Sequence, residues 1–277
     1  MVTAIDGRRM ARNIILPLKK EEELRRKSNR QFCLVSAMVG RNTAAYSFLV
    51  EQNRVADEIG MTLVAYRRSE DIISPRLFLN VVREFSSNFT VGGVLVNLPL
   101  PKQYDDFKEK ILDSIDPKKD VGCLNPITKN VLPPAVEVVN NILKEAGWSL
   151  EGKKVVVMGA GFLVGSPIVQ YFGKLCGVMS VFTSKNAGGS VCESALRAAD
   201  LVICGTGKPG ILKPEMVRPG AGVIDFGFSL KDDKPMGDLD TSSPYISDLA
   251  FYTPTPGGTG PVLTACLFEN YYKLTKL

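Results

Sequence analysis

The sequence lacks histidine altogether. This absence excludes an imidazole general base, a nucleophile activated by histidine and a histidine metal ligand. The sequence also lacks any apolar run near the ~20 residues that a membrane-spanning helix requires. Its first residues lack the apolar segment of a signal peptide. We therefore expect a cytoplasmic protein with no membrane partner.

No charge of one sign dominates, since 34 Lys and Arg stand against 29 Asp and Glu. The basic residues at positions 19–27 are interleaved with glutamates, as on a solvated helix face, and we expect no nucleic-acid partner. The six cysteines form no CxxC pair, which indicates free thiols in a reducing compartment. With no histidine and no cluster of carboxylates in the sequence, no metal site is expected.

Apolar, strand-like segments alternate with helical ones along the chain. Strands are expected at residues 31–38, 62–66, 91–97, 154–158, 178–182, 201–204 and 222–225, and helices at 43–59, 75–85, 105–115, 136–146 and 262–273. Strands separated by helices predict an α/β fold with parallel sheets. The length of 277 residues suits two modest domains.

A glycine-rich turn follows the strand expected at 154–158. Its residues Gly159, Gly161 and Gly165 have the spacing GxGxxxG, and a helical segment comes next. Such glycines let the backbone approach a pyrophosphate, and the N-terminus of the following helix favours its charge. The order of strand, turn and helix predicts a dinucleotide site. The alternative is a turn that only packs the strand against the helix.

Two further segments bear on this site. Ser184 and Lys185 come after the second strand of the series, where NAD-preferring sites commonly place Asp or Glu. A hydroxyl and an ammonium suit a 2′-phosphate, so NADP is the expected cofactor. Thr206 lies in another glycine-containing turn, after the strand at 201–204, and is expected to contribute.

Three motifs together carry a family resemblance. They are VLVNLPLP at residues 94–101, the glycine turn at 159–165, and PTPGGTGP at 254–261. The chain resembles the methylenetetrahydrofolate dehydrogenase/cyclohydrolase family, whose motifs read VQLPLP, GxSxxVGxP and PGGVGPMT. The resemblance implies NADP-dependent oxidation of 5,10-methylenetetrahydrofolate to the methenyl form in one-carbon metabolism, followed by methenyl hydrolysis. It also implies a homodimer.

The resemblance further implies a domain division and a set of site residues. A folate domain would comprise residues 1–135 plus 258–277, a Rossmann-like NADP domain residues 136–257, and the cleft would lie between them. The family's dinucleotide contacts fall on Gly159, Ala160, Gly161, Ser184 and Phe228. Its folate contacts fall on Phe48, Pro99, Gly122, Pro256, Gly257 and Gly258, and its catalytic pair on Gln52 and Asn97.

Four of the positions on the folate side depart from the family's residue types. Gln52 stands where the family has its catalytic Lys, and Asn97 where it has Gln. Phe48 replaces a Tyr and Gly122 replaces an Asp. Because a carboxamide does not titrate, Gln52 cannot act as a general acid or base. We predict that cyclohydrolase activity is weak or absent, whereas hydride transfer depends on positioning and needs no proton removed.

Two alternatives remain open from the sequence. The loss of a carboxylate at Gly122 suggests a dehydrogenase for a modified pterin carrier. The four altered positions together suggest a degenerate family member that binds nucleotide without catalysis.

Overall fold

The computed structural model describes residues 2–28, 31–186, 189–231 and 234–276. The chain forms two compact units. One comprises Met1–Met10 and Ala135–Leu263, and the other Ala11–Pro134 and Thr264–Leu277. They are named below the six-stranded unit and the three-stranded unit, after their sheets. Among the described residues, no helix combines the length and the apolar character needed to cross a membrane.

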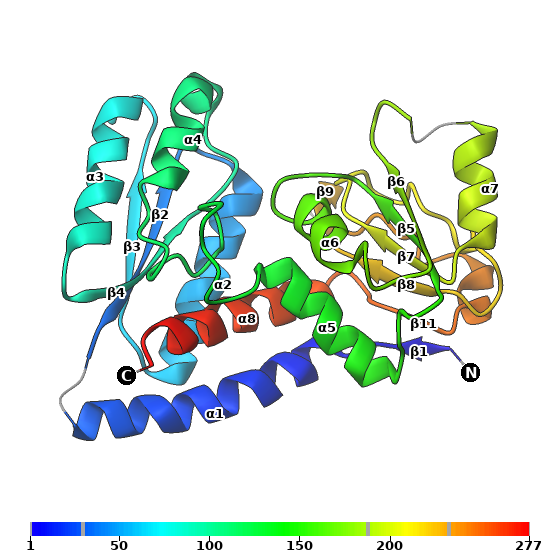
Figure 1. Cartoon of the computed structure of the whole chain (residues 1–277), viewed down its shortest axis with the longest axis horizontal. Helices are drawn as coiled ribbons and strands as arrows, with labels where there is room; N and C mark the ends of the chain where they lie inside the picture. Colours follow the sequence, from blue (N-terminus) through cyan, green and yellow to red (C-terminus); the bar gives the residue numbers. More distant parts are fainter. Residues whose placement is uncertain (1, 29–30, 187–188, 232–233, 277) are drawn as a thin grey trace. The chain divides into compact units, whose positions relative to one another are not determined.

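The three-stranded unit has a parallel sheet in the order β3-β2-β4 (Figure 1). Its strands and the helices that pack with them are β2 (Cys33–Val39), α2 (Thr43–Ile59), β3 (Leu63–Arg68), α3 (Pro75–Ser87), β4 (Val91–Val96), η1 (Lys102–Tyr104) and α4 (Asp105–Asp113), with parts of α1 (Gly7–Lys27) and α8 (Thr259–Leu274). β2 and β4 are buried along almost their whole length, so this sheet lies in the centre of the unit's core.

Helix α2 carries two of the predicted site residues, and its ends are fixed locally. The side chain of Asn42 accepts a hydrogen bond from Ala45 N at the start. Gly60 ends the helix with φ +89°, a conformation that favours glycine. The buried positions recur every three or four residues and face the core: Ala45, Leu49, Gln52, Val55, Ala56 and Ile59. Gln52 is the polar member of this otherwise apolar stripe.

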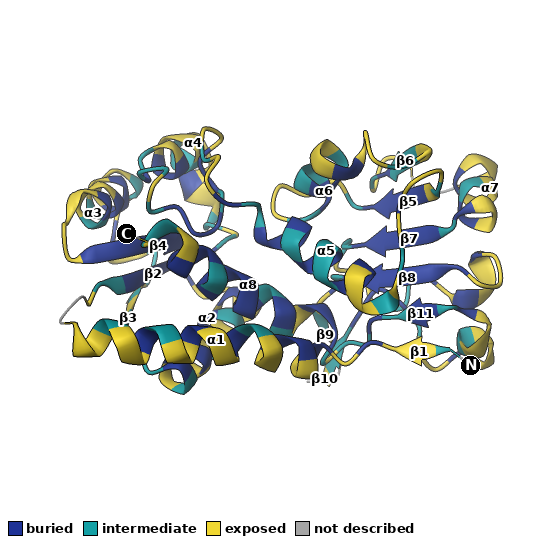
Figure 2. Ribbon diagram, turned by 60° about the horizontal axis from the view of Figure 1, so that its bottom comes forward, coloured by how far each residue is buried: buried dark blue, intermediate teal, exposed yellow. Residues whose placement is uncertain are grey.

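The six-stranded unit has a parallel sheet in the order β1-β11-β8-β7-β5-β6. Its elements are β1 (Thr3–Ala4), α5 (Pro134–Ala146), β5 (Lys154–Met158), α6 (Gly165–Phe172), β6 (Val178–Phe182), α7 (Ser190–Ala198), β7 (Leu201–Cys204), η2 (Pro214–Met216), β8 (Gly222–Asp225), β9 (Ser229–Lys231), β10 (Lys234–Met236), η3 (Pro244–Asp248) and β11 (Phe251–Tyr252). Figure 2 shows β5, β7 and β8 as buried strands in the middle of this sheet.

The strand order of this sheet reverses at β5. The chain runs from β5 to β6 on one side and then returns to β7 on the other side. In an open parallel sheet, the carboxyl ends of the strands on either side of such a switch leave a crevice for ligands. The turns after β5 and β7 therefore mark the expected ligand end of the six-stranded unit.

The predicted α/β class with parallel sheets is confirmed, and the bounds of four strands, β5 to β8, agree with the prediction. The last helix was predicted to begin at residue 262 but begins at Thr259, because its first turn tolerates Pro261. The two-residue strands β1 and β11 and the β9–β10 hairpin were not predicted. Strands this short carry too few residues for a periodic pattern.

Candidate functional site

Two predicted catalytic residues lie in a closed ring of buried side chains in the three-stranded unit. Ser36 Oγ donates to Gln52 Oε1 at 2.6 Å, and Gln52 Nε2 donates to Asn97 Oδ1 at 3.0 Å. Asn97 Nδ2 closes the ring by donating to Ser36 Oγ at 2.8 Å, and it also contacts the carbonyl of Ala37 at 3.1 Å. The three residues come from β2, α2 and the end of β4. They are named below the amide ring.

The amide ring carries no charge. A hydroxyl and two carboxamides donate and accept hydrogen bonds but do not titrate near neutral pH. All three side chains are at least 97% buried, since their exposed fractions are 0%, 1% and 3%. The arrangement is therefore suited to holding a fixed pattern of donors and acceptors and is unsuited to proton transfer.

Ser36 was not predicted as part of this site. It is the polar residue within the apolar run of β2, Leu34–Val39, and it is completely buried. Buried hydroxyls need hydrogen-bond partners, so a lone serine in a central strand was a usable signal.

The other predicted folate residues of this unit differ in their exposure and in their neighbours. Phe48 lies one helical turn before Gln52, half-buried and packed against the core. Pro99 is exposed and follows a cis peptide bond. Gly122 is buried, and a Cβ atom there would lie 2.9 Å from Leu95 Cδ1. An aspartate at position 122 would therefore require its apolar neighbours to move.

The predicted Pro256–Gly258 segment belongs to the six-stranded unit. It begins with a cis peptide bond before Pro256, and Gly257 has φ +103°. Gly258 N donates to the carbonyl of Pro254 at 2.7 Å, and a Cβ atom on Gly258 would lie 2.5 Å from that oxygen. Glycine is thus required here by close backbone packing. Pro256 is exposed at the surface of this tight turn.

The glycine turn after β5 packs against the turn after β7. Gly159 has φ +97°, and a Cβ atom there would lie 2.6 Å from the carbonyl oxygen of Gly205. A Cβ atom on Gly165 would lie 1.8 Å from the oxygen of Gly159. Ala160 and Gly161 are exposed, and a Cβ atom on Gly161 would meet no described atom within 4 Å. The turn therefore offers an open backbone surface at the N-terminus of α6, which fits a pyrophosphate.

The remaining predicted dinucleotide residues are accessible in the same unit. Ser184 and Lys185 are exposed after β6, in a turn whose shape is fixed by Asn186 Oδ1, which accepts from Thr183 N at 2.6 Å. Thr206 is half-buried after β7, and Phe228 is 41% exposed after β8. All of these residues follow the carboxyl ends of strands, where ligands bind in sheets of this type.

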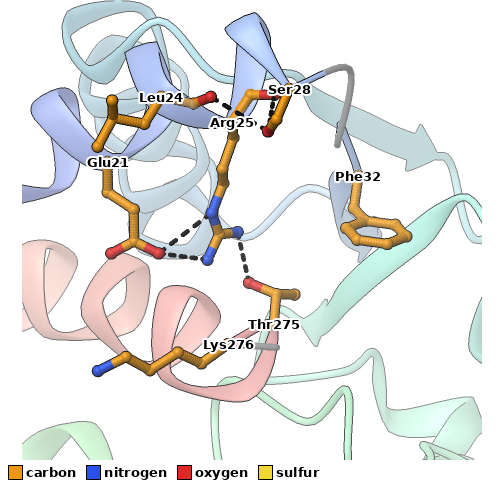
Figure 3. Close-up of a pocket in the computed structure, with 7 residues that line it drawn as sticks. All are labelled: Glu21, Leu24, Arg25, Ser28, Phe32, Thr275 and Lys276. Atoms are coloured by element: carbon orange, nitrogen blue, oxygen red, sulfur yellow. Dashed lines mark hydrogen bonds and ion pairs between the residues drawn. The ribbon is translucent and has the colours of Figure 1, made fainter.

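A surface pocket of about 220 Å³ lies elsewhere on the three-stranded unit (Figure 3). It is lined by Glu21, Leu24, Arg25, Ser28, Phe32, Thr275 and Lys276. The Arg25 guanidinium already contacts Glu21 at 2.5 Å and Thr275 Oγ1 at 2.7 Å, and it lies over the ring of Tyr272. The pocket includes none of the predicted site residues.

The switch in strand order, the glycine turn and the exposed residues after β6 and β8 define a nucleotide-binding α/β protein. The family comparisons then place it more narrowly. The catalytic-domain model of tetrahydrofolate dehydrogenase/cyclohydrolase matches residues 5–122, and the NAD(P)-binding-domain model of the same family matches residues 133–277. The chain belongs to the tetrahydrofolate dehydrogenase/cyclohydrolase family.

Relatives span the whole chain. It is 30% identical to the bifunctional protein FolD of Clostridium tetani, with all of both chains covered. The crystal structure of the FolD dehydrogenase/cyclohydrolase of Campylobacter jejuni has a TM-score of 0.90 and 30% identity, covering 100% of this chain and 99% of that one. The Trypanosoma brucei FolD, solved with NADP and an inhibitor, has a TM-score of 0.89 at 24% identity over 99% of this chain and 97% of that one, and so shares the fold.

Proposed function

We propose that the protein oxidises 5,10-methylenetetrahydrofolate to 5,10-methenyltetrahydrofolate with NADP, and that its cyclohydrolase activity is weak or absent. The observation that carries this proposal is the uncharged amide ring at Gln52 and Asn97. Membership of the dehydrogenase/cyclohydrolase family supports the reaction class, and the NAD(P)-binding-domain match supports the cofactor.

The dehydrogenase reaction places modest demands on the protein. NADP, when bound, supplies the acceptor for a hydride from the methylene carbon. The proposed roles of the chain's own residues are to hold the two reactants and to exclude water. Gly159 to Gly161 would face the pyrophosphate, Phe228 and Thr206 would contact the nucleotide, and Ser184 and Lys185 would receive the 2′-phosphate. No group that titrates near neutral pH is needed for any of these roles.

On the folate side, we consider the residues of each unit by themselves. Phe48 offers a ring face for stacking on the pterin. Pro99 and Gly122 would shape the surface around it within the three-stranded unit. The buried amide ring would hold Gln52 and Asn97 in place beneath this surface. Pro256, Gly257 and Gly258 are the folate contacts proposed for the six-stranded unit. In this assignment the three-stranded unit supplies most of the folate contacts, and the six-stranded unit supplies the NADP contacts.

Methenyl hydrolysis makes a demand that the amide ring does not meet. Water must attack the cationic carbon, and protons must move as the ring opens. Gln52 is fixed by two hydrogen bonds, and its carboxamide does not titrate near neutral pH. The methenyl product should therefore persist, apart from its spontaneous hydrolysis.

The test follows reduced nicotinamide and methenyl product separately in one reaction with 5,10-methylenetetrahydrofolate. With NADP we expect both to accumulate in equal amounts, and the same reaction with NAD should be slower. Formation of the formyl product well above the spontaneous rate would contradict the reading of Gln52. Binding of NADP without any turnover would instead favour a member of the family that has lost catalysis.

We further propose a cytoplasmic homodimer. The six cysteines, all of which lie in the described part of the chain, form no disulfide, and this supports a reducing compartment. The edge strand β6 of the six-stranded sheet, whose first residue Val178 is 53% exposed, offers backbone groups for pairing with a second copy. Light scattering after gel filtration would report the mass in solution, and a monomer would refute the dimer.

A further inference from the structure

The turn after β7 is held by a buried carboxylate from a distant part of the chain. Asp238, which follows β10, is fully buried. Its Oδ2 accepts a hydrogen bond from Thr206 N at 2.5 Å, and its Oδ1 accepts one from Lys208 N at 2.9 Å. A Cβ atom on Gly227 would lie 2.3 Å from Oδ1, so this glycine leaves the space that the carboxylate fills.

A second buried carboxylate holds the first in place. Asp225, the last residue of β8, accepts hydrogen bonds from Gly227 N at 2.7 Å and from Leu239 N at 2.9 Å. Gly227 packs against the Asp238 side chain, and Leu239 is the next residue after Asp238 in the chain. Asp225 thereby fixes the loop from which Asp238 reaches the turn.

The two carboxylates lie beside the buried thiol of Cys204, and the three possible ligand atoms fall within 4.8 Å of one another. Their hydrogen bonds argue against a cation site. Each of the four carboxylate oxygens already accepts a backbone N–H, at distances from 2.5 to 2.9 Å. Cys204 Sγ also donates to Asp225 Oδ1 at 3.5 Å, so the polar groups of the cluster already have partners within the protein.

The turn that Asp238 holds lies at the switch in strand order. Its first residue, Gly205, packs against Gly159 of the glycine turn, since a Cβ atom on Gly159 would approach the Gly205 carbonyl oxygen to 2.6 Å. The shape of one turn therefore depends on the shape of the other. A residue that fixes the turn at Gly205–Lys208 also fixes one side of the surface proposed to meet the dinucleotide.

We propose that Asp238 is a positioning residue for the dinucleotide: by accepting Thr206 N and Lys208 N, it holds the turn after β7 in the shape required beside the glycine turn. The inference rests on the proposed NADP site and adds a residue that lies outside the sequence motifs. Asp238 acts through the backbone of the turn and does not itself contact the ligand.

The test compares Asp238→Asn with Asp240→Asn. The first change keeps the shape of the side chain but turns one acceptor into a donor that faces an N–H group. In the second, the substituted residue lies two positions after Asp238, and its carboxylate bonds only to Ser242 among the contacts that the structure describes. Both variants carry the same change in charge.

Two measurements follow. Hydrogen exchange in the NADP-free protein measures the exchange rates of the backbone amides of Thr206 and Lys208. Calorimetry measures the dissociation constant for NADP. In Asp238→Asn we expect both amides to exchange at least about tenfold faster and NADP to bind about tenfold more weakly, as for the loss of one hydrogen bond to a charged group. The KM for the folate should change less than twofold, and Asp240→Asn should match the wild type throughout.

Equal NADP affinity in Asp238→Asn and the wild type would overturn the inference while leaving the proposed reaction intact. Tight NADP binding by the wild type without turnover would refute the proposed reaction but leave the role of Asp238 standing. Absence of NADP binding to the wild type would refute both. If Asp238→Asn does not fold, hydrogen exchange of the wild type decides: amides of Thr206 and Lys208 that exchange as fast as open loops would overturn the inference.

Discussion

Replacing Asp225 with Asn should change how the stability of the protein depends on pH. The Asp225 carboxyl is 1% exposed. Burial, reinforced by the charge of the neighbouring Asp238, raises its pKa from 3.8 to about 6, although backbone N–H groups of Leu239 and Gly227 partly oppose the shift. Asparagine preserves the shape and removes the titration.

The sign and size of the effect follow from linkage between proton binding and folding. With a pKa of about 6 in the folded state and 3.8 when unfolded, the folded protein binds this proton more tightly. The associated stabilisation is fully present below pH 3.8 and is lost as the pH rises through 6. The difference of about 2.2 pH units corresponds to ~3 kcal/mol in total, of which about 2.5 kcal/mol is lost between pH 4 and pH 7.

The assay is denaturant unfolding of the wild type and Asp225→Asn at several pH values from 4 to 7. The free energy of unfolding of the wild type, minus that of the variant, should fall by roughly 2 to 2.5 kcal/mol across this range. The cost of placing an amide at this position adds a constant to the difference in the free energy of unfolding, and this constant does not vary with pH. The buried Cys204 thiol adds no pH dependence in this range either, because burial raises its pKa well above 9.0.

Asp240→Asn serves as a control of opposite sign. A hydrogen bond from Ser242 lowers the pKa of Asp240, so its contribution to stability is present at neutral pH and is lost as the pH falls. A difference between the wild type and Asp225→Asn that does not vary with pH would refute the reasoning about burial of Asp225.

Two other substitutions test the two proposed sites, one in each unit. Gln52→Lys puts an ammonium beside the acceptors of Ser36 and Asn97, and it should raise the rate of methenyl hydrolysis at least about tenfold, measured as decay of the methenyl product. Gln52→Met is the matched control. No gain in the lysine variant would contradict the role assigned to position 52. Gly159→Ala drives a Cβ atom to 2.6 Å from the Gly205 oxygen at φ +97°, and it should destabilise the protein by about 1–3 kcal/mol and weaken NADP binding in calorimetry more than tenfold. Gly161→Ala, whose Cβ atom meets no described atom within 4 Å, should leave stability nearly unchanged, and equal effects at both glycines would refute the packing argument.

The sequence predicted the parts of the fold that depend on local patterns. The β-branched run at residues 154–158 and the glycines after it predict a strand and a turn without knowledge of distant residues. Helix α2 was predicted with its observed bounds because Gly60 ends the apolar periodicity. Its alignment with the family then placed Gln52 near Asn97, and the structure joins them by a hydrogen bond.

The residues that the sequence missed act across long separations. Asp238 reaches Thr206 and Lys208, which lie 32 and 30 positions earlier. Ser36 meets Asn97, which lies 61 positions later. Neither contact leaves a periodic signal, because each joins residues that only the folded chain brings together. The roles proposed for Phe48, Pro99 and Gly122 remain predictions.

The amide ring has a consequence beyond this protein. If Gln52 and Asn97 provide no route for protons, oxidation and ring opening of the one-carbon unit become separate events. The methenyl compound would then leave as a free, cationic metabolite, available to any other enzyme that uses it. The rate at which the formyl compound forms would then be set by a separate hydrolase or by uncatalysed hydrolysis. That step would be regulated independently of the redox state of the nicotinamide pool.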